Sequence, residues 1–458
     1  MIPLSLANIA EIVQGELCNV ADPNKIVNLH AVIDSRKADS NTFFAALQGE
    51  NVDGHDFAES AIKNGAEFAL LSRDLGLSSI LVDDVTIALS HLAQSVRSQL
   101  PNLKVIAITG SQGKTTTKDL LQHLLSAVGE SVANEASLNN ELGVPLTLLR
   151  CNKNTKFCVV EMGARHRGDI AHLMEIAAPD VGLVLVVGKA HIGEFGSQEE
   201  IAETKAELIA GLADTSVAVL GTYDRFTPHM ADGRAMKVIS FGEKSSCLVR
   251  AADIELREGR AHFDLVTPEG RQAVGLQLLG MHQVANALGA AAAATALGIS
   301  LETISAALST AEVASKWRMA LMQEDELLLI NDSYNANPES MAAALRTLVL
   351  LAQERGGATW AILGKMHELG ESSIEEHQSI GRLASDIGVD HLVSVGTRDF
   401  LSAEGDGEMV QHYFSDIASA VEITTHFSAG DVVLVKASRA EGFEVLAEQI
   451  MSAWKASE

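Results

Sequence analysis

One stretch of eight residues has the composition of a phosphate-binding loop: Thr109-Gly-Ser-Gln-Gly-Lys-Thr-Thr116. It follows the apolar run Val105–Thr109, which predicts a strand buried on both faces, and a helix is predicted over residues 115–128. In such a strand, loop and helix arrangement, Gly110 and Gly113 let backbone N–H groups turn toward a phosphate, and the helix N-terminus adds partial positive charge. The loop therefore predicts a nucleotide site.

Two side chains of this loop suit a triphosphate and its metal. Lys114 can reach the β- and γ-phosphate oxygens, and Thr115 can bind Mg²⁺. The loop departs from the general G-x-x-x-x-G-K-[ST] pattern, because Ile108 stands where the first glycine is expected. The alternative, a glycine turn with a surface lysine, is disfavoured by the buried strand ahead of it. The residues assigned to nucleotide binding are Gly110, Ser111, Gln112, Gly113, Lys114, Thr115 and Thr116.

Three further residues stand where ligands of a parallel sheet collect. Glu161 closes the next predicted strand, and His191 follows the one after it, both at a carboxyl edge. Lys205 lies in a predicted helix. Each also has a plain structural interpretation: a capping carboxylate, a structural histidine, and a lysine in solvated i,i+4 pairing. Their neighbours in the sequence do not decide between these alternatives.

Taken together, the order and spacing of these motifs resemble the Mur ligases over nearly the whole chain. The resemblance rests on the glycine loop, Glu161, an Ala-His-x-x-x-Phe-Gly-Ser stretch, Lys205 and His282-Gln-Val-Ala-Asn286. Three stretches are similar to the branch that adds D-alanyl-D-alanine: Asp332-Ser-Tyr-Asn-Ala-Asn-Pro338, Ser137-Leu-Asn-Asn-Glu-Leu-Gly-Val-Pro145 and Met366-His-Glu-Leu-Gly370. The Asp-Asn-Pro-Arg tetrapeptide of the diaminopimelate-adding branch is absent.

The resemblance implies a role for each matching residue. Lys114 would bind the γ-phosphate, Thr115 and Glu161 one Mg²⁺, and His191 and Lys205 a second. Lys205 would be carbamylated, which requires its neutral amine to react with CO₂. The catalytic set is thus Lys114, His191 and Lys205; Asn286, Arg318 and Asp332 would contact the nucleotide; and Ser35, Arg36, Asn139, Asn140, Asn335 and Asn337 would face the substrates. Asn335 and Asn337 could instead make local turn bonds ahead of Pro338.

Two positions depart from the pattern of the family. Lys189 stands where an asparagine is expected before the Ala-His pair. Lys365 stands where relatives carry an aspartate in a Gly-Asp-Met stretch. We assign no role to either lysine.

The elements that position these residues indicate an α/β fold with three domains. Apolar runs alternate with helical stretches twice, over residues 84–314 and again over 315–458, which is typical of parallel sheets. Short alternating runs over residues 248–280 predict an antiparallel hairpin insert. The resemblance implies that these are a small N-terminal α/β domain for a UDP-sugar (1–83), a central P-loop ATPase-type domain (84–314) and a mobile C-terminal Rossmann-like domain (315–458).

Composition limits the partners. The 458 residues carry a net charge of −26, which opposes nucleic acid and anionic membranes, so phosphate binding must come from local features. The four cysteines show no paired spacing, and no signal peptide or membrane-spanning run is visible. These features predict a reduced, cytoplasmic protein that binds neither nucleic acid nor membrane. We expect a monomer, although no sequence feature fixes the oligomeric state.

The resemblance implies a peptidoglycan-precursor ligase. ATP, with Mg²⁺ ions expected at two sites, would convert the terminal carboxylate of a UDP-N-acetylmuramoyl-tripeptide to an acyl phosphate, which the amine of D-alanyl-D-alanine would attack. Folylpolyglutamate synthetase shares the ligase core but lacks a UDP-binding domain. It is therefore disfavoured by the roughly 100 residues ahead of the loop, a length near one domain, which contain Asp34-Ser-Arg36. A nucleotide-switch protein of another class stays an alternative. The sequence does not say whether the third stem residue is diaminopimelate or lysine.

Overall fold

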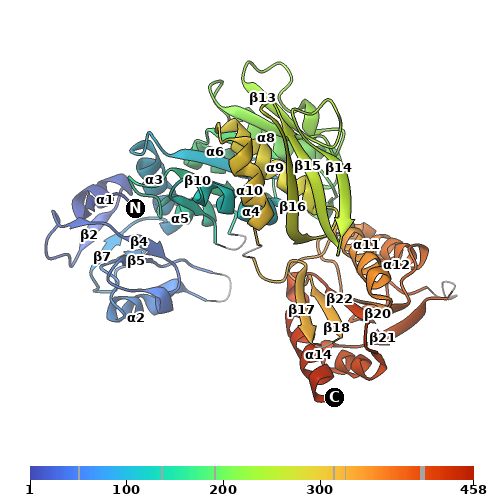
Figure 1. Ribbon diagram of the computed structural model, residues 1–458. Coiled ribbons are helices and arrows are strands. Elements are labelled where there is room, and N and C mark those ends of the chain that lie inside the picture. The colour runs from blue at the N-terminus through green and yellow to red at the C-terminus, as the bar shows by residue number, and fades with distance from the viewer. Residues whose placement is uncertain are drawn as a thin grey trace.

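Three α/β units follow one another along the chain in the computed structural model (Figure 1), which describes residues 1–49, 52–135, 138–189, 192–312, 315–324, 326–402 and 408–457. Each unit is built on its own sheet. The prediction of a three-domain α/β fold is confirmed. Among the described residues, no helix is long and apolar enough to cross a bilayer.

The N-terminal unit is small and carries a mostly parallel sheet in the order β2-β7-β6-β5-β4, of which only β2 runs antiparallel. Its first helix is capped by Ser5, whose side chain accepts a bond from the Asn8 N–H. The elements of this unit are β1 (Leu4–Ser5), α1 (Leu6–Ile12), β2 (Glu16–Cys18), β3 (Ile26–Val27), β4 (His30–Val32), β5 (Thr42–Ala45), α2 (Ala58–Lys63), β6 (Ala69–Leu71) and β7 (Ser79–Leu81).

The central unit holds a nine-stranded sheet in the order β16-β15-β14-β13-β12-β11-β8-β10-β9. Strands β8 to β13 are parallel to their neighbours, and β14 pairs in parallel with β13, whereas β15 and β16 extend that edge antiparallel. Its strands are β8 (Lys104–Thr109), β9 (Ser131–Ala133), β10 (Phe157–Glu161), β11 (Val181–Val184), β12 (Val217–Gly221), β13 (Lys237–Gly242), β14 (Val249–Arg257), β15 (Arg260–Thr267) and β16 (Gly270–Leu279). Its helices are α3 (Val85–Ser98), α4 (Lys114–Ser126), α5 (Gly143–Leu148), α6 (Asp169–Ala177), α7 (Ile192–Phe195), α8 (Gln198–Ala210), α9 (Gln283–Ala296) and α10 (Leu301–Thr310).

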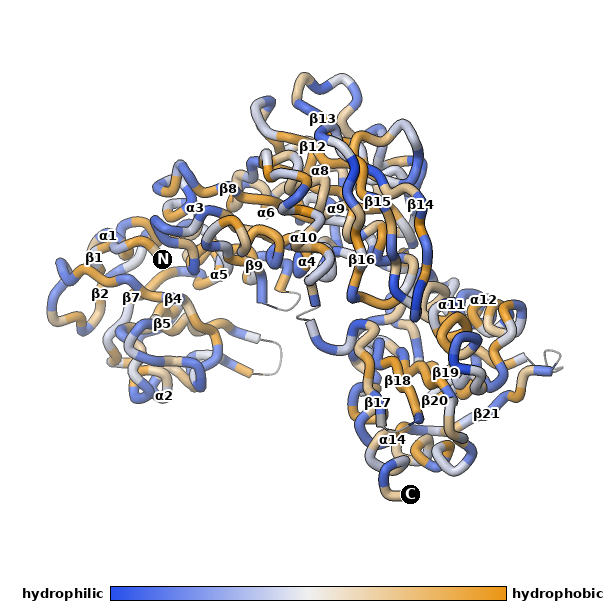
Figure 2. Tube along the Cα trace, in the orientation of Figure 1, coloured by the Kyte–Doolittle hydropathy of each residue, from blue (hydrophilic) through white to orange (hydrophobic). Residues whose placement is uncertain are grey.

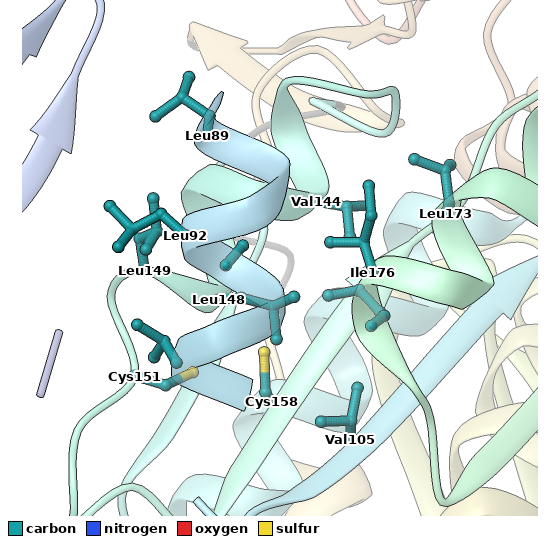
Figure 3. Packing of buried hydrophobic residues seen from close by; sticks show 14 of the residues in the cluster. Leu89, Leu92, Val105, Val144, Leu148, Leu149, Cys151, Cys158, Leu173 and Ile176 are labelled. Carbon is teal, nitrogen blue, oxygen red and sulfur yellow. The ribbon is translucent and has the colours of Figure 1, made fainter. Parts of the chain in front are cut away.

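Strand β8 is buried on both faces, as predicted. Val105 and Ala107 join the core under α3, α5 and α6, where Cys158 also packs (Figure 3). Ile106 and Ile108 join the opposite core, formed with α4, α9 and α10. Helices on both faces hold β8 in the middle of the sheet, so the loop that follows it starts from a rigid base. All four cysteines are free thiols.

The region over residues 248–280 is antiparallel, as predicted, but it is not a separate hairpin. It forms three strands, and β14 pairs in parallel with β13, so the meander continues the central sheet. Along β15, every second residue is buried, and the alternation of apolar and polar residues is visible in Figure 2. One face of the meander therefore packs on α9 and α10, and the other faces solvent.

The C-terminal unit has a six-stranded sheet in the order β17-β18-β22-β19-β20-β21, parallel except for β17. Leu328 and Ile330 pack toward α11 and α12, while Leu327 and Leu329 pack toward α14. The elements are β17 (Ala320–Glu324), β18 (Leu327–Asn331), α11 (Pro338–Arg355), β19 (Thr359–Leu363), α12 (Ser373–Asp386), β20 (His391–Val395), β21 (Val410–Phe414), α13 (Ile417–Ala420), β22 (Val432–Lys436) and α14 (Phe443–Ser457).

Candidate active site

The glycine loop connects the carboxyl end of β8 to the first turn of α4. Gly113 precedes the helix with φ +81°, a conformation that side-chain-bearing residues rarely adopt. A Cβ atom there would lie 2.2 Å from the Asn286 Oδ1 atom, so only glycine fits between the loop and α9. The half-buried Lys114 ammonium donates to the Gly110 carbonyl at 2.8 Å. The loop is therefore curled tightly around the start of α4.

A hydroxyl, a carboxylate and an amide meet beside this loop. Thr115 Oγ1 donates to Glu161 Oε2 at 2.9 Å, and Asn139 Nδ2 donates to Glu161 Oε1 at 2.9 Å. The backbone N–H of Glu161 donates to Asn134 Oδ1 at 2.7 Å. Glu161 is only 1% exposed. A hydroxyl and a carboxylate oxygen at this separation are hard ligands of the kind Mg²⁺ prefers, so the residues present fit that metal.

The segment that enters the C-terminal unit lies across the start of α4. Arg318 Nη2 donates to Thr115 Oγ1 at 3.0 Å, and the guanidinium lies 4.2 Å from the centre of the Tyr334 ring. The Ser315 N–H donates to Asp119 on α4 at 3.1 Å. The cation of Arg318 is thereby fixed next to the Thr115–Glu161 pair.

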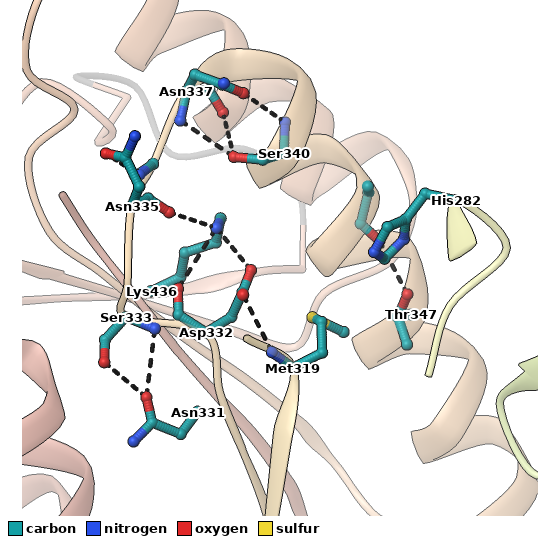
Figure 4. A network of polar contacts seen from close by, with 12 residues as sticks. His282, Met319, Asn331, Asp332, Ser333, Asn335, Asn337, Ser340, Thr347 and Lys436 are labelled. Carbon is teal, nitrogen blue, oxygen red and sulfur yellow. Dashed lines mark hydrogen bonds and ion pairs between the residues drawn. The ribbon is translucent and has the colours of Figure 1, made fainter. Parts of the chain in front are cut away.

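A second network closes the site from the C-terminal side (Figure 4). The buried Lys436 ammonium donates to Asp332 Oδ2 at 2.6 Å and to the Asn335 carbonyl at 2.8 Å. Asp332 Oδ1 accepts the Met319 N–H at 3.1 Å. Asn337 caps α11, because its Oδ1 atom accepts the Ser340 N–H. Burial lowers the pKa of the nearby His282 to about 4, so this imidazole is neutral at pH 7.

These groups line one cavity of about 730 Å³ between the central and C-terminal units. That size is in the range of nucleotide and other small-molecule sites. The predicted site residues that line it are Ser111, Gln112, Gly113, Lys114, Thr115, Thr116, Asn139, Glu161, Asn286, Arg318, Asp332, Asn335 and Asn337. Residues far apart in the sequence are thus brought to one place.

Other predicted site residues do not line this cavity. Ser35 is buried and Arg36 is exposed in the N-terminal unit, where Arg36 pairs with Asp34. Asn140 is exposed; its Oδ1 atom accepts the Gly143 N–H at the start of α5, and its Nδ2 atom donates to the Glu141 carboxylate. The Gly110 carbonyl accepts the hydrogen bond from the Lys114 ammonium. The prediction for His191 lies outside the described residues.

Lys205 lies on α8 and is 5% exposed. Burial lowers its pKa to about 7, and the charge of Lys114 lowers it further in the same direction. Burial also lowers the pKa of Lys114, with Arg318 acting in the same direction and Glu161 opposing it. Two cationic side chains, Lys114 and Arg318, therefore lie beside the Thr115–Glu161 pair in a protein whose net charge is −26. This local excess of positive charge suits a polyphosphate.

Sequence reasoning missed several residues of this site. Lys436 ends the apolar run of β22 at its carboxyl edge, the same signal that singled out Glu161 at the end of β10. Tyr334 lies within the Asp332–Pro338 motif, but nothing in the sequence places its ring under Arg318. Asn134 and Asp119 act by holding other site residues, and no local pattern marks such residues.

Fold and site together define a class: a P-loop nucleotide-binding enzyme in which a second α/β unit closes the nucleotide cavity. Comparison with known families refines this. The Mur ligase family catalytic domain matches residues 30–109, the Mur ligase middle domain residues 108–294, and the Mur ligase glutamate ligase domain residues 317–439. The chain belongs to the Mur ligase family.

Several relatives that match nearly the whole chain carry the same name. The UDP-N-acetylmuramoyl-tripeptide–D-alanyl-D-alanine ligase of Mycobacterium tuberculosis (strain ATCC 25618 / H37Rv) is 39% identical over 99% of this chain and 98% of its own. The Escherichia coli (strain K12) enzyme of the same name is 35% identical over 97% of both chains. A crystal structure of MurF from Acinetobacter baumannii has a TM-score of 0.88 at 36% identity, covering 98% of this chain and 99% of its own. MurF ligase from Thermotoga maritima in complex with ADP has a TM-score of 0.80 at 28% identity, covering 94% and 99%.

Proposed function

We propose that this chain joins D-alanyl-D-alanine to a UDP-N-acetylmuramoyl-tripeptide by an amide bond, using ATP, in peptidoglycan precursor synthesis. The observation that carries this proposal is the Lys114, Thr115 and Glu161 set at the carboxyl edge of the central sheet, in a cavity that Arg318 and Asp332 of the C-terminal unit also line. The full-length similarity to ligases of that name supports the choice of substrates. Because the reaction consumes ATP, we place the enzyme in the cytoplasm.

The reaction needs activation because a carboxylate repels amines and oxide is a poor leaving group. One oxygen of the tripeptide's terminal carboxylate attacks the γ-phosphorus, the bond from that phosphorus to the β–γ bridging oxygen breaks, and ADP leaves. The amine of D-alanyl-D-alanine then attacks the acyl carbon, phosphate leaves with the carboxylate oxygen, and the amine loses a proton. In this scheme, Lys114 and Arg318 stabilise the negative charge on the transferring phosphoryl group.

Thr115 and Glu161 are the residues that would hold Mg²⁺. When bound, the ion supplies charge neutralisation between the β- and γ-phosphates. Among the described residues, there is no group of three or more His, Cys, Asp or Glu side chains that could hold a metal. Phosphate oxygens and water would supply the other ligands of the ion. A second site with His191 and Lys205 stays a prediction. Carbamylation of Lys205 is part of the proposal, and its pKa of about 7 supports it, because a neutral amine is available near pH 7.

The remaining assignments concern the substrates. We place the UDP-sugar on the N-terminal unit (1–83), near Ser35 and Arg36, and the nucleotide between the units spanning 84–314 and 315–458. Asn139 bonds Glu161 and faces the same cavity, so a substrate carboxylate bound next to it would lie close to the transferring phosphate. Asn335 and Asn337 line the opposite wall.

Amine-dependent release of ADP tests this function. With the UDP-tripeptide and ATP present, ADP should form at least about a hundredfold faster when D-alanyl-D-alanine is added, because the acyl phosphate otherwise stays in a closed site. Equal rates with and without the dipeptide would favour the nucleotide-switch alternative. Running the assay with the diaminopimelate and the lysine forms of the UDP-tripeptide identifies the third stem residue.

A further inference from the structure

Lys189, which had no role in the sequence analysis, makes the most direct polar contact between the loop after β11 and the C-terminal unit. Its ammonium donates to Glu376 Oε1 of α12 at 2.8 Å, and its backbone N–H donates to Glu339 Oε1 of α11 at 2.9 Å. The Glu376 side chain is 15% exposed and that of Lys189 is 52% exposed. One residue of the central unit is thus held by two helices of the other unit.

Backbone packing continues this contact a few residues further on. The Gly193 N–H at the start of α7 donates to the Glu368 carbonyl at 3.3 Å. A Cβ atom on Gly193 would lie 2.5 Å from the Gly370 nitrogen, so the two backbones touch where no side chain fits. The charged contact at Lys189 and the close contact at Gly193 therefore bring the same two surfaces together.

This interface adjoins the nucleotide cavity. Gly188, directly before Lys189, and Glu339, which accepts its N–H, both line that cavity. The Ser111 hydroxyl accepts the Gly188 N–H at 2.8 Å, which connects the interface to the phosphate-binding loop. A shift of α11 and α12 away from Lys189 would therefore open the cavity on this side.

We propose that the Lys189–Glu376 ion pair is a positioning contact that holds the C-terminal unit over the bound nucleotide and thereby sets nucleotide affinity. It acts through Gly188 and Glu339, not by touching the reacting atoms. Lys189 faces three carboxylates, those of Glu376, Glu339 and Glu375, and the first of these dominates the rise in its pKa. The inference rests on the proposed function only in taking the cavity ligand to be an adenine nucleotide.

A double-mutant cycle on the full-length chain tests this, with ADP and Mg²⁺ as the probe and calorimetry as the readout. Lys189→Gln should weaken ADP binding about fivefold at low ionic strength, and Glu376→Gln about twofold to threefold, because Glu339 and Glu375 still attract the lysine. The double variant should bind no more weakly than Lys189→Gln alone. At high salt, the differences should shrink.

The matched control is Lys63→Gln, which removes the same charge from an ion pair with Glu59 on α2 and should leave ADP affinity unchanged. Unchanged affinity in Lys189→Gln, or a double variant whose loss equals the product of the two single losses, would overturn the proposal. If the variants show the expected coupling in ADP binding but the wild-type chain forms no amide, the proposed function is refuted and the positioning contact is supported. If the wild-type chain forms the amide but Lys189→Gln binds ADP normally, the positioning contact is refuted and the proposed function is supported.

Discussion

At the residue scale, the site concentrates cations around one buried carboxylate. Lys114 and Arg318 contact the loop and its threonine, and the charge of Arg318 acts to lower the pKa of Lys114. Without anions, such cations repel one another. A triphosphate would relieve that repulsion, which is how local charge can bind phosphate in a chain whose net charge is −26.

Lys114 should be indispensable for turnover. Lys114→Ala removes the cation nearest the loop and should reduce kcat for ADP formation by at least about a hundredfold, the scale of losing one preorganised donor to transition-state charge. The variant should keep its circular dichroism spectrum, because within the described part of the chain the lysine bonds only the Gly110 carbonyl. A rate within a few-fold of wild type would remove Lys114 from the mechanism.

The pH dependence of Lys205 follows from its lowered pKa. At a pKa of about 7, the neutral amine increases from about a tenth at pH 6 to about nine tenths at pH 8, and only the neutral form reacts with CO₂. Bicarbonate-dependent activity should therefore increase over this interval. Lys205→Ala should lose activity and regain part of it with acetate or propionate, but not with chloride at equal ionic strength. Unchanged activity of Lys205→Ala would exclude the carbamate.

A site residue could be predicted from the sequence where its neighbours in the chain form a recognisable pattern, such as an apolar strand directly before it. Thr115 and Glu161 follow apolar strands and could be placed at the same sheet edge from the sequence. Lys436 had the same signal at the end of β22, and it was overlooked. Tyr334 and Asp119 act through contacts with residues distant in the chain, so only the folded structure reveals them.

At the scale of elements, the loop depends on how closely α9 approaches α4. The Asn286 side chain lies where a Cβ atom on Gly113 would be, and Asn286 is held by its own bond to Gln283 at 2.7 Å. The sequence predicted the strand and helix on either side of this loop. It could not predict that a helix about 170 residues further on packs against the glycine, because such contacts depend on the register of the whole sheet.

Gly113→Ala tests this packing. The added methyl group would meet Asn286, and the alanine backbone would have to keep a positive φ. Both the nucleotide affinity and the free energy of unfolding should therefore decrease, the latter by about 1–3 kcal/mol. Gly298→Ala is the matched control, because its φ is +75° but no atom lies within 4 Å of the added Cβ. It should lose about 1 kcal/mol of unfolding free energy and keep its affinity for ADP. Equal affinities in both variants would contradict the account of the loop.

Two strands at sheet edges give only a weak signal in the sequence. β9 has three residues, and β21 has a partly polar sequence, so neither gives a continuous apolar run like that of β8 or β22. Central parallel strands are predictable because both faces are buried, whereas edge strands need only one buried face.

At the scale of the whole molecule, function depends on two α/β units meeting over one cavity. The phosphate loop and the Thr115–Glu161 pair belong to the central unit, while Asp332, Lys436 and Asn335 belong to the C-terminal unit. The cores of these two units share only Leu279 of β16 among the described residues, so the units can move relative to one another without exposing a large shared hydrophobic core. Closure of the C-terminal unit would keep water away from an acyl phosphate.

The central claim is that ATP activates the substrate's own carboxylate. The direct measurement is the fate of ¹⁸O placed in the terminal carboxylate of the UDP-tripeptide, followed by mass spectrometry of the phosphate released during ligation to D-alanyl-D-alanine. The account predicts that each phosphate carries one labelled oxygen from that carboxylate. Unlabelled phosphate, formed alongside amide product, would show that ATP is hydrolysed by water and would contradict it.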